Sequence, residues 1–173
     1  SRALTACEGA LLVVDASQGI QAQTLANAYL ATEAGAEILG VINKVDLPAA
    51  QPDLVAEEIE HVLGIRKNEC FRISAKTGVG VKDLLDAVCE LLPSPADRSD
   101  EPTRALIYDS HYDDYRGVIC YVRVFSGSLK PRQKIRFMEL GSTYQITELG
   151  IFRPDMRPVD QLGTGEVGYV IAN

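Results

Sequence analysis

Two short polar motifs in this chain have residue types and spacing that could form a site for one ligand. The first is Asn43-Lys44-x-Asp46, which follows an apolar run at residues 38–43 that is typical of a buried strand. The carboxylate of Asp46 could accept two parallel hydrogen bonds from a ring N–H and an adjacent amino group, the pattern that guanine offers and adenine does not. The Asn43 amide could reach N7 of the same base and tie its loop to a neighbouring segment, while the Lys44 stem could lie along the base face.

The second motif is Ser74-Ala75-Lys76, which follows another short apolar run at residues 70–73. The backbone N–H of Ala75 could donate to guanine O6, Lys76 could flank the base from the other side, and Ser74 could orient the carboxylate of the first motif. Ligands of open α/β sheets bind beyond the carboxyl ends of the strands, where both motifs are expected. Either motif alone could be an ordinary turn, but two motifs suited to one base favour a binding site.

Strands alternate with helices in the first half of the chain, which predicts a parallel sheet covered by helices. Strands are expected over residues 10–15, 38–43 and 70–73, and helices over 21–34, 52–64 and 81–92. Asp15, at the end of the first strand, is expected to shape the following turn rather than to take part in chemistry. Apolar spacing predicts that each helix buries one face, comprising Leu25, Ala28, Tyr29 and Thr32 in the first helix, Val55, Ile59, Val62 and Leu63 in the second, and Leu84, Leu85, Val88, Leu91 and Leu92 in the third.

The second half of the chain has a different apolar period. Residues 93–103 contain three prolines and several charges and are typical of a linker. Beyond them, residues 118–125 alternate as in a strand packed on both faces, and further short strands near 133–140 and 143–152 are separated by glycine turns. We therefore expect an α/β nucleotide-binding domain over residues 1–92, a linker over 93–103, and a small antiparallel β-barrel over 104–173.

Composition excludes several classes of function. The formal net charge of −7 argues against a generic polyanion-binding protein, and no DNA partner is expected. The charge is uneven, because residues 1–101 carry 8 Lys+Arg against 16 Asp+Glu, while residues 102–173 carry 9 against 8. No apolar run approaches the roughly 18 residues that span a bilayer, so a cytoplasmic protein is expected. The four cysteines and two histidines show no metal-binding spacing, and no metal site is predicted.

The two motifs resemble the fourth and fifth sequence motifs of GTPases, and the chain as a whole resembles the translational GTPases. The further similar segments are residues 7–16 with Gly19 and 22–24, then 43–50, 74–81, 104–110 and 149–152. The resemblance implies the C-terminal part of a GTP-binding domain followed by most of a β-barrel second domain. It also implies that the guanine base of GTP or GDP is contacted by Asn43, Lys44, Asp46, Ser74, Ala75 and Lys76.

Some motifs of the family are not recognised in this sequence. The phosphate-binding loop of the family, Gly-x-x-x-x-Gly-Lys-Ser/Thr, is not found, because no lysine of the chain follows a glycine. Mg²⁺ is implied for the family, but none of its ligands is recognised here, and no catalytic residue is predicted. Asp114-x-x-Gly117 and Asp160-x-x-Gly163 match the family's Asp-x-x-Gly motif but are interpreted as turns. At residues 132–133 the family more often has Gly-Asp, which puts the turn geometry there in question.

Two classes of function follow as hypotheses. The first is a fragment, itself inactive, of a ribosome-associated GTP hydrolase of protein synthesis, in a branch of the family linked to backward movement of tRNAs. Its partners would be guanine nucleotide and the ribosome. The alternatives are a non-catalytic module that binds ribosome or RNA and has vestigial guanine loops, or a fragment of another translational GTPase. No membrane-spanning segment is expected, and the resemblance leaves peripheral membrane association open.

Overall fold

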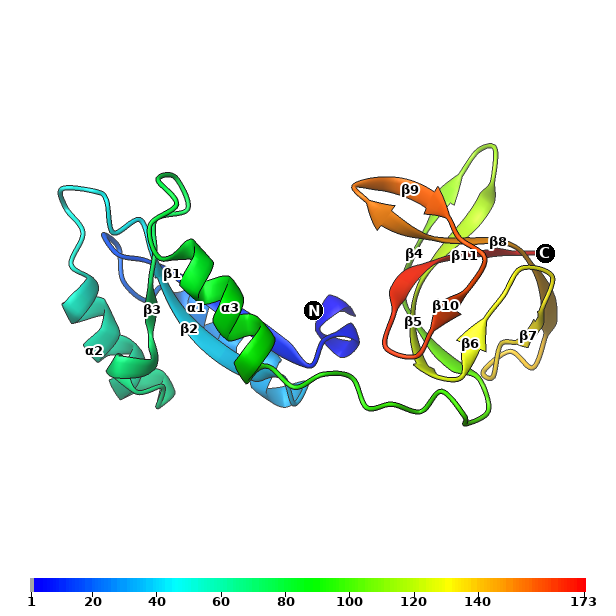
Figure 1. Cartoon of the computed structure of the whole chain (residues 1–173), viewed down its shortest axis with the longest axis horizontal. Helices are drawn as coiled ribbons and strands as arrows, with labels where there is room; N and C mark the ends of the chain where they lie inside the picture. The colour runs from blue at the N-terminus through cyan, green and yellow to red at the C-terminus, as the bar shows by residue number, and fades with distance from the viewer. Residues whose placement is uncertain (1) are drawn as a thin grey trace. The chain divides into compact units, whose positions relative to one another are not determined.

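The computed structural model describes residues 2–173, which form two compact units (Figure 1). The first unit contains Cys7–Ser94, and the second contains Pro95–Asn173 together with the short 3₁₀ helix η1 at Arg2–Ala6. Within the described part of the chain, no helix is both long enough and apolar enough to cross a membrane.

A three-stranded parallel sheet is the centre of the first unit. Its strands β1 (Gly9–Asp15), β2 (Glu37–Asn43) and β3 (Phe71–Arg72) lie side by side in that order. The helices are α1 (Ala22–Glu33), α2 (Pro52–Leu63) and α3 (Val81–Leu91), with a 3₁₀ turn, η2 (Lys67–Glu69), before β3. This confirms the expected α/β arrangement, in which each parallel strand is reached through a helical connection.

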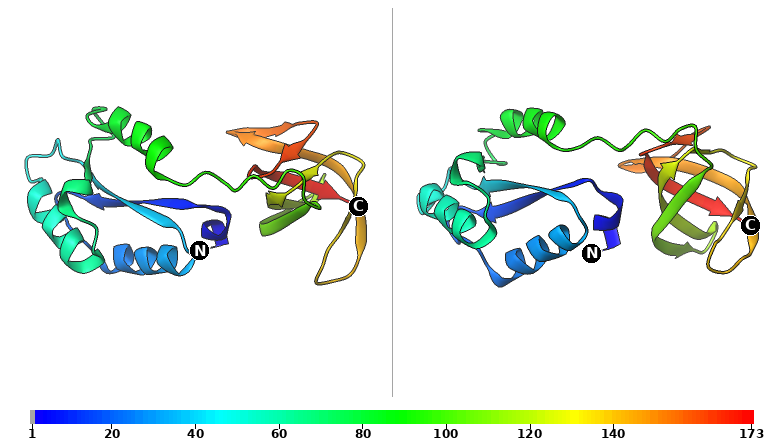
Figure 2. Two further views of the ribbon diagram at one scale, coloured as in Figure 1. Left: turned by 60° about the horizontal axis from the view of Figure 1, so that its bottom comes forward. Right: turned by 90° about the horizontal axis from the view of Figure 1, so that it is seen from below.

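The two faces of this sheet are covered by different helices. Helices α1 and α2 lie on one face and α3 lies on the other (Figure 2). Successive strand residues point to opposite faces, so the apolar runs can fill both cores. The first core contains Leu12, Val14, Ile42, Ala28, Val55, Ala56 and Ile59, and the second contains Val41, Ile73 and Leu84.

The helices bury narrower stripes than the apolar spacing predicts. The residues wrongly expected to be buried are Tyr29, Thr32, Val62, Leu85 and Leu91, all of which are exposed. The buried residues are Ala28 and Ala31 on α1, and Leu84 and Ala87 on α3, of which Ala28 and Leu84 were expected. Apolar residues that flank these buried positions, such as Tyr29 and Leu85, are exposed in the described part of the chain.

An antiparallel sheet makes up most of the second unit. Its strands are β4 (Arg104–Asp113), β5 (Gly117–Ser126), β7 (Lys134–Arg136), β8 (Thr143–Arg153), β9 (Asp155–Pro158) and β11 (Val167–Ala172). The order is β4-β5-β11-β8-β7, with β9 paired to β8, and β6 (Ser128–Leu129) pairs separately with β10 (Leu162–Gly163). The sheet curls around a core of residues such as Val122, Val124, Ile146, Leu149 and Val170, as expected for a barrel-like fold.

A tight turn at residues 130–133 connects β6 to β7. The N–H of Gln133 donates to the carbonyl of Lys130 over 3.3 Å, Pro131 takes the second position, and Arg132 has a φ of 67° in the third. These are the features of a type II turn, whose third position favours glycine. The turn is therefore formed even though an arginine stands where glycine is more usual.

Arg132→Gly is expected to stabilise the second unit by about 0.5–1 kcal/mol, because glycine adopts this φ without the steric cost of a Cβ. The measurement is the urea midpoint of unfolding. Arg136→Gly is the matched control, since it removes the same charge from a β7 position without a positive φ, and it should destabilise the fold. An Arg132→Gly chain that unfolds in less urea than the wild type would contradict backbone strain at this turn.

The segment between the two units is exposed throughout residues 93–103. Its second part is anchored to the second unit, because Gly127 N–H donates to the Arg98 carbonyl and Ser126 Oγ donates to the Pro102 carbonyl. Limited proteolysis with a non-specific protease is therefore expected to cut first within residues 93–97, ahead of these anchors. A first cut within residues 104–125 would show that the domain boundary lies elsewhere.

Candidate functional site

The carboxyl ends of β2 and β3 bring the two predicted motifs to one edge of the sheet. Asn43 is the last residue of β2, and residues 74–76 follow closely after β3. Two backbone hydrogen bonds join the segments, from Ile73 N–H to the Ile42 carbonyl (2.8 Å) and from Val45 N–H to the Ile73 carbonyl (3.2 Å). The loops that carry the motifs are therefore fixed against each other.

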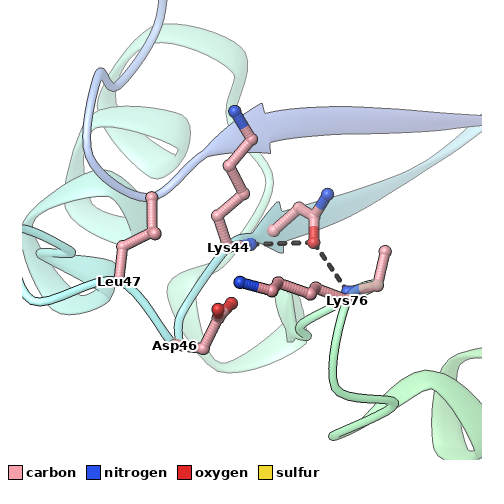
Figure 3. Close-up of a pocket in the computed structure, with 6 residues that line it drawn as sticks. Lys44, Asp46, Leu47 and Lys76 are labelled. Atoms are coloured by element: carbon pink, nitrogen blue, oxygen red, sulfur yellow. Dashed lines mark hydrogen bonds between the residues drawn. The ribbon is translucent and has the colours of Figure 1, made fainter.

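The side chain of Asn43 links the two loops. Its Oδ1 accepts hydrogen bonds from the N–H of Lys44 (2.8 Å) and from the N–H of Ala75 (3.0 Å), shown as dashed lines in Figure 3. Because Oδ1 is occupied by two donors, the Nδ2 group is the part of this amide that can donate to a ligand. The Ala75 N–H, predicted as a donor to guanine O6, is already engaged by Asn43, so a base oxygen would have to share that bond.

Asp46 and Ser74 form the polar base of the site. Ser74 is fully buried, and its hydroxyl donates a hydrogen bond to the Asp46 carboxylate while its Oγ accepts one from the N–H of Thr77 (3.1 Å). The bond from Ser74 and the nearby charge of Lys76 lower the pKa of Asp46 below its usual value. Asp46 is thus ionised at neutral pH and presents only acceptors, as the orienting role expected of Ser74 requires.

Two lysine side chains stand around Asp46. Lys76 extends toward the Asp46 carboxylate, whereas Lys44 extends toward the end of β1 (Figure 3). There, Lys44 Nζ lies 2.7 Å from Asp15 Oδ2. Hydrogen bonding to Lys44 and to Ser17 lowers the pKa of Asp15 to about 2. The two lysine side chains therefore point in different directions, and each lies on a different side of the space between the two loops.

An open pocket of about 270 Å³ lies between these loops. Pockets that enclose whole small ligands usually occupy about 300–1,000 Å³, so this one suits part of a ligand, such as a single planar base. Its acceptor-only carboxylate and amide donor match the donor and acceptor edges of guanine. The residues that line it are Asn43, Lys44, Asp46, Leu47, Ala75 and Lys76.

The loop after β3 is held by a short turn and a glycine. Ser74 N–H donates to the Val79 carbonyl (2.9 Å), and Gly78 N–H donates back to the Ser74 carbonyl (2.8 Å). Gly80 directly precedes α3 and has a φ of 69°, and a Cβ there would lie 2.3 Å from the Arg72 carbonyl oxygen. The close approach of α3 to β3 thus requires glycine, and it fixes where the Ser-Ala-Lys loop leaves the sheet.

Comparison with known protein families assigns both halves of the chain. The sequence profile of the elongation factor Tu GTP-binding domain matches residues 1–94, and that of elongation factor Tu domain 2 matches residues 117–173. The chain belongs to the translational GTPase family. Both motifs of the site lie within the residues that match the GTP-binding domain of this family.

Individual translational GTPases are similar along almost the whole chain. Elongation factor 4 of Gloeobacter violaceus is 56% identical over 99% of the chain, and that of Clostridium novyi is 54% identical over 100% of it. The chain spans 29% of the length of each of these relatives. The crystal structure of translation elongation factor SelB from Methanococcus maripaludis, apo form, superposes with a TM-score of 0.80 at 18% identity, covering 98% of this chain and 37% of that one, which supports the fold.

Two residues at or near the pocket were not predicted as part of the site. Leu47 lines the pocket directly after Asp46, and its position next to the motif was the only signal. Asp15 was expected to shape a turn, which it does through hydrogen bonds from Ser17, but it also binds the ammonium group of Lys44. Parallel pairing places Asp15 opposite Asn43 in the register, which strand prediction alone does not specify.

Proposed function

We propose that the pocket binds the guanine base of GTP or GDP. The observation that carries the proposal is that a fixed acceptor, the Asp46 carboxylate, and a fixed donor, the Asn43 Nδ2 group, line the same pocket. Asp46, kept ionised by the bond from Ser74, would accept from N1–H and the 2-amino group. Asn43, whose Oδ1 is occupied by two backbone donors, would offer its Nδ2 to N7.

The other lining residues would enclose the base. Guanine O6 would share the Ala75 N–H with Asn43, since that donor already has one acceptor at 3.0 Å. The stems of Lys44 and Lys76 would cover the two faces, and the apolar side chain of Leu47 would contact the base from the same loop. Together, these residues would select guanine, and none of the proposed contacts is to a phosphate group.

Binding by these residues alone would be weak. The base has about eleven heavy atoms, and at roughly 0.3 kcal/mol per atom its contacts would contribute about 3 kcal/mol. A millimolar site already requires about 4 kcal/mol. We therefore expect a dissociation constant of about 1 mM or weaker for guanine nucleotides.

The protein to which these residues belong would be a GTP hydrolase of protein synthesis in the cytoplasm, acting on the ribosome in backward movement of tRNAs. Mg²⁺ would neutralise phosphate charge in that protein. Within residues 2–173 no group of three or more His, Cys, Asp or Glu side chains could hold a metal ion, so no Mg²⁺ ligand is assigned to them. The part played by residues 43–46 and 74–76 would be selection of the base, and this chain alone would not hydrolyse GTP.

Titration of the ¹⁵N-labelled chain with mononucleotides tests the proposed site. GMP should shift the amide signals of residues 44–47 and 75–76, IMP should act more weakly because it lacks the 2-amino group, and AMP should have no effect. Equal responses to AMP and GMP would refute guanine recognition. Micromolar binding of GDP would instead reveal a phosphate site among these residues.

A second candidate function, contact with ribosomal RNA, is favoured by a basic strip on the second unit. The strip consists of Lys130, Arg132, Lys134 and Arg136, all of which are exposed and none of which forms an ion pair with any of residues 2–173. Lys134 and Arg136 lie two residues apart on β7, the edge strand of the sheet, so they point to the same face. Four unpaired cations in a chain of net charge −7 would offer phosphate groups a local positive surface.

Fluorescence anisotropy with a labelled RNA would test this surface. Replacing Lys130, Lys134 and Arg136 together by glutamine should weaken binding and reduce the slope of log K against log salt by about 2. The control replaces Arg66, Lys67 and Lys82 by glutamine, which removes the same charge from residues that already pair with carboxylates. Equal losses in both triple variants would show that only net charge matters and would remove β7 from the interface.

A further inference from the structure

The carboxylate of Asp15 is fixed by groups on both of its oxygens. Oδ1 accepts hydrogen bonds from the N–H of Ser17 (2.8 Å) and from its Oγ (2.6 Å), and Oδ2 lies 2.7 Å from Lys44 Nζ. The side chain of Asp15 is only 17% exposed, whereas that of Lys44 is 52% exposed. Asp15 is therefore the better fixed partner, and Lys44 is the one that the pair immobilises.

Both ends of Lys44 are thereby held. Its backbone has a φ of 67°, and its N–H is bound by Asn43 Oδ1 while its carbonyl accepts from the N–H of Leu47 (3.1 Å). Its ammonium group is drawn to the end of β1, away from Asp46 (Figure 3). A lysine stem has many rotamers when its far end is free, and fixing that end leaves the stem extended along one wall of the pocket.

We infer that Asp15 is a positioning residue for guanine recognition, because it holds the Lys44 stem in place as a wall of the base pocket. The inference rests on the proposed guanine site and adds a residue that does not line the pocket. The base would then bind against a stem that is already ordered, and the cost of ordering it would not be subtracted from the binding free energy. Without the carboxylate charge, that cost would appear as weaker binding of the base.

Asp15→Asn isolates this effect, since asparagine keeps an Oδ1 that can accept from Ser17 but lacks the charge that holds Lys44. The backbone of the turn should persist, because Ala16 N–H donates to the Asn43 carbonyl and Gly19 N–H donates to the Asp15 carbonyl. GMP is expected to bind the variant about 3- to 10-fold more weakly, which corresponds to ordering one long side chain. The Lys44 ammonium signal in ¹⁵N NMR should also move toward that of a solvent-exposed lysine.

A double-mutant cycle shows whether Asp15 acts through Lys44. Lys44→Met keeps most of the stem and removes the ammonium group, so Asp15→Asn should change GMP binding by less than about twofold in that background. Asp97→Asn is the matched control, because Asp97 also accepts a hydrogen bond from the serine two residues later and pairs with no cation among the described residues. It should leave GMP binding unchanged.

Three results would overturn the inference. The first is that Asp15→Asn binds GMP as well as or better than the wild type, as expected if the pair holds Lys44 away from the nucleotide. The second is an equal loss in the Lys44→Met background, which would assign the effect to the turn. The third is no response of the wild-type chain to GMP, which refutes the guanine site itself and this inference with it. The first two results leave the guanine site standing.

Discussion

In the Asp46→Asn variant, GMP is expected to lose its effect on the pocket while xanthosine monophosphate gains one. An asparagine can accept from only one of the two guanine donors, and its NH₂ group would face the 2-amino group without an acceptor. Xanthine has an oxygen at that position, which can accept from the amide. The preference for GMP over the xanthine nucleotide should therefore fall by about 100-fold or more, as measured by amide shifts in parallel titrations.

Asp86→Asn provides the control for loss of one carboxylate charge. Asp86 lies on α3, where it pairs with Lys82 and does not line the pocket. This variant should retain the wild-type preference for GMP. If Asp46→Asn also retained that preference, Asp46 would have to be removed from the base-recognition residues.

Asn43→Ala should lower both the stability of the first unit and its response to GMP. Alanine leaves the N–H groups of Lys44 and Ala75 without the acceptor that joins the two loops. The free energy of unfolding should fall by about 1–2 kcal/mol, measured by urea unfolding. Binding should become undetectable because the N7 donor is lost and the two loops, without the Asn43 link, keep the backbone hydrogen bonds of Ile73 with Ile42 and Val45.

Asn43→Asp separates these two effects. An aspartate keeps an oxygen for both N–H groups, so stability should stay close to that of the wild type. It offers no donor to N7, so GMP should still bind at least about 10-fold more weakly. Wild-type GMP binding by Asn43→Asp would show that this side chain only joins the loops and does not contact the base.

The strand and helix order was predictable because the apolar runs and their periods are strong local signals. The expected strands at residues 10–15 and 38–43 are within the observed strands, and the change to period two beyond residue 104 correctly indicates an antiparallel sheet. The buried helix faces were harder to predict. Tyr29 and Leu85 fit the apolar spacing but are exposed, because tertiary packing decides which apolar positions of a helix contact the sheet.

The placement of the candidate site residues around one pocket was predictable to a similar extent. Asn43, Asp46 and Ala75 were expected at one edge of the sheet, because their motifs lie at the carboxyl ends of two parallel strands. The ion pair between Asp15 and Lys44 was not foreseen, because it depends on the register of β1 against β2. The link from Asn43 to a neighbouring segment was predicted, but its donor was not, because the Ala75 N–H had been assigned to guanine O6 alone.

A crystal structure of the chain soaked with GMP is the most direct test of the central claim. We expect a base between the stems of Lys44 and Lys76, with the Asp46 carboxylate within hydrogen-bonding distance of N1 and the 2-amino group, and Asn43 Nδ2 close to N7. Lys44 Nζ should remain paired with Asp15. A base bound elsewhere on the chain, or one in this pocket with another edge turned toward Asp46, would contradict guanine recognition by Asp46 and Asn43.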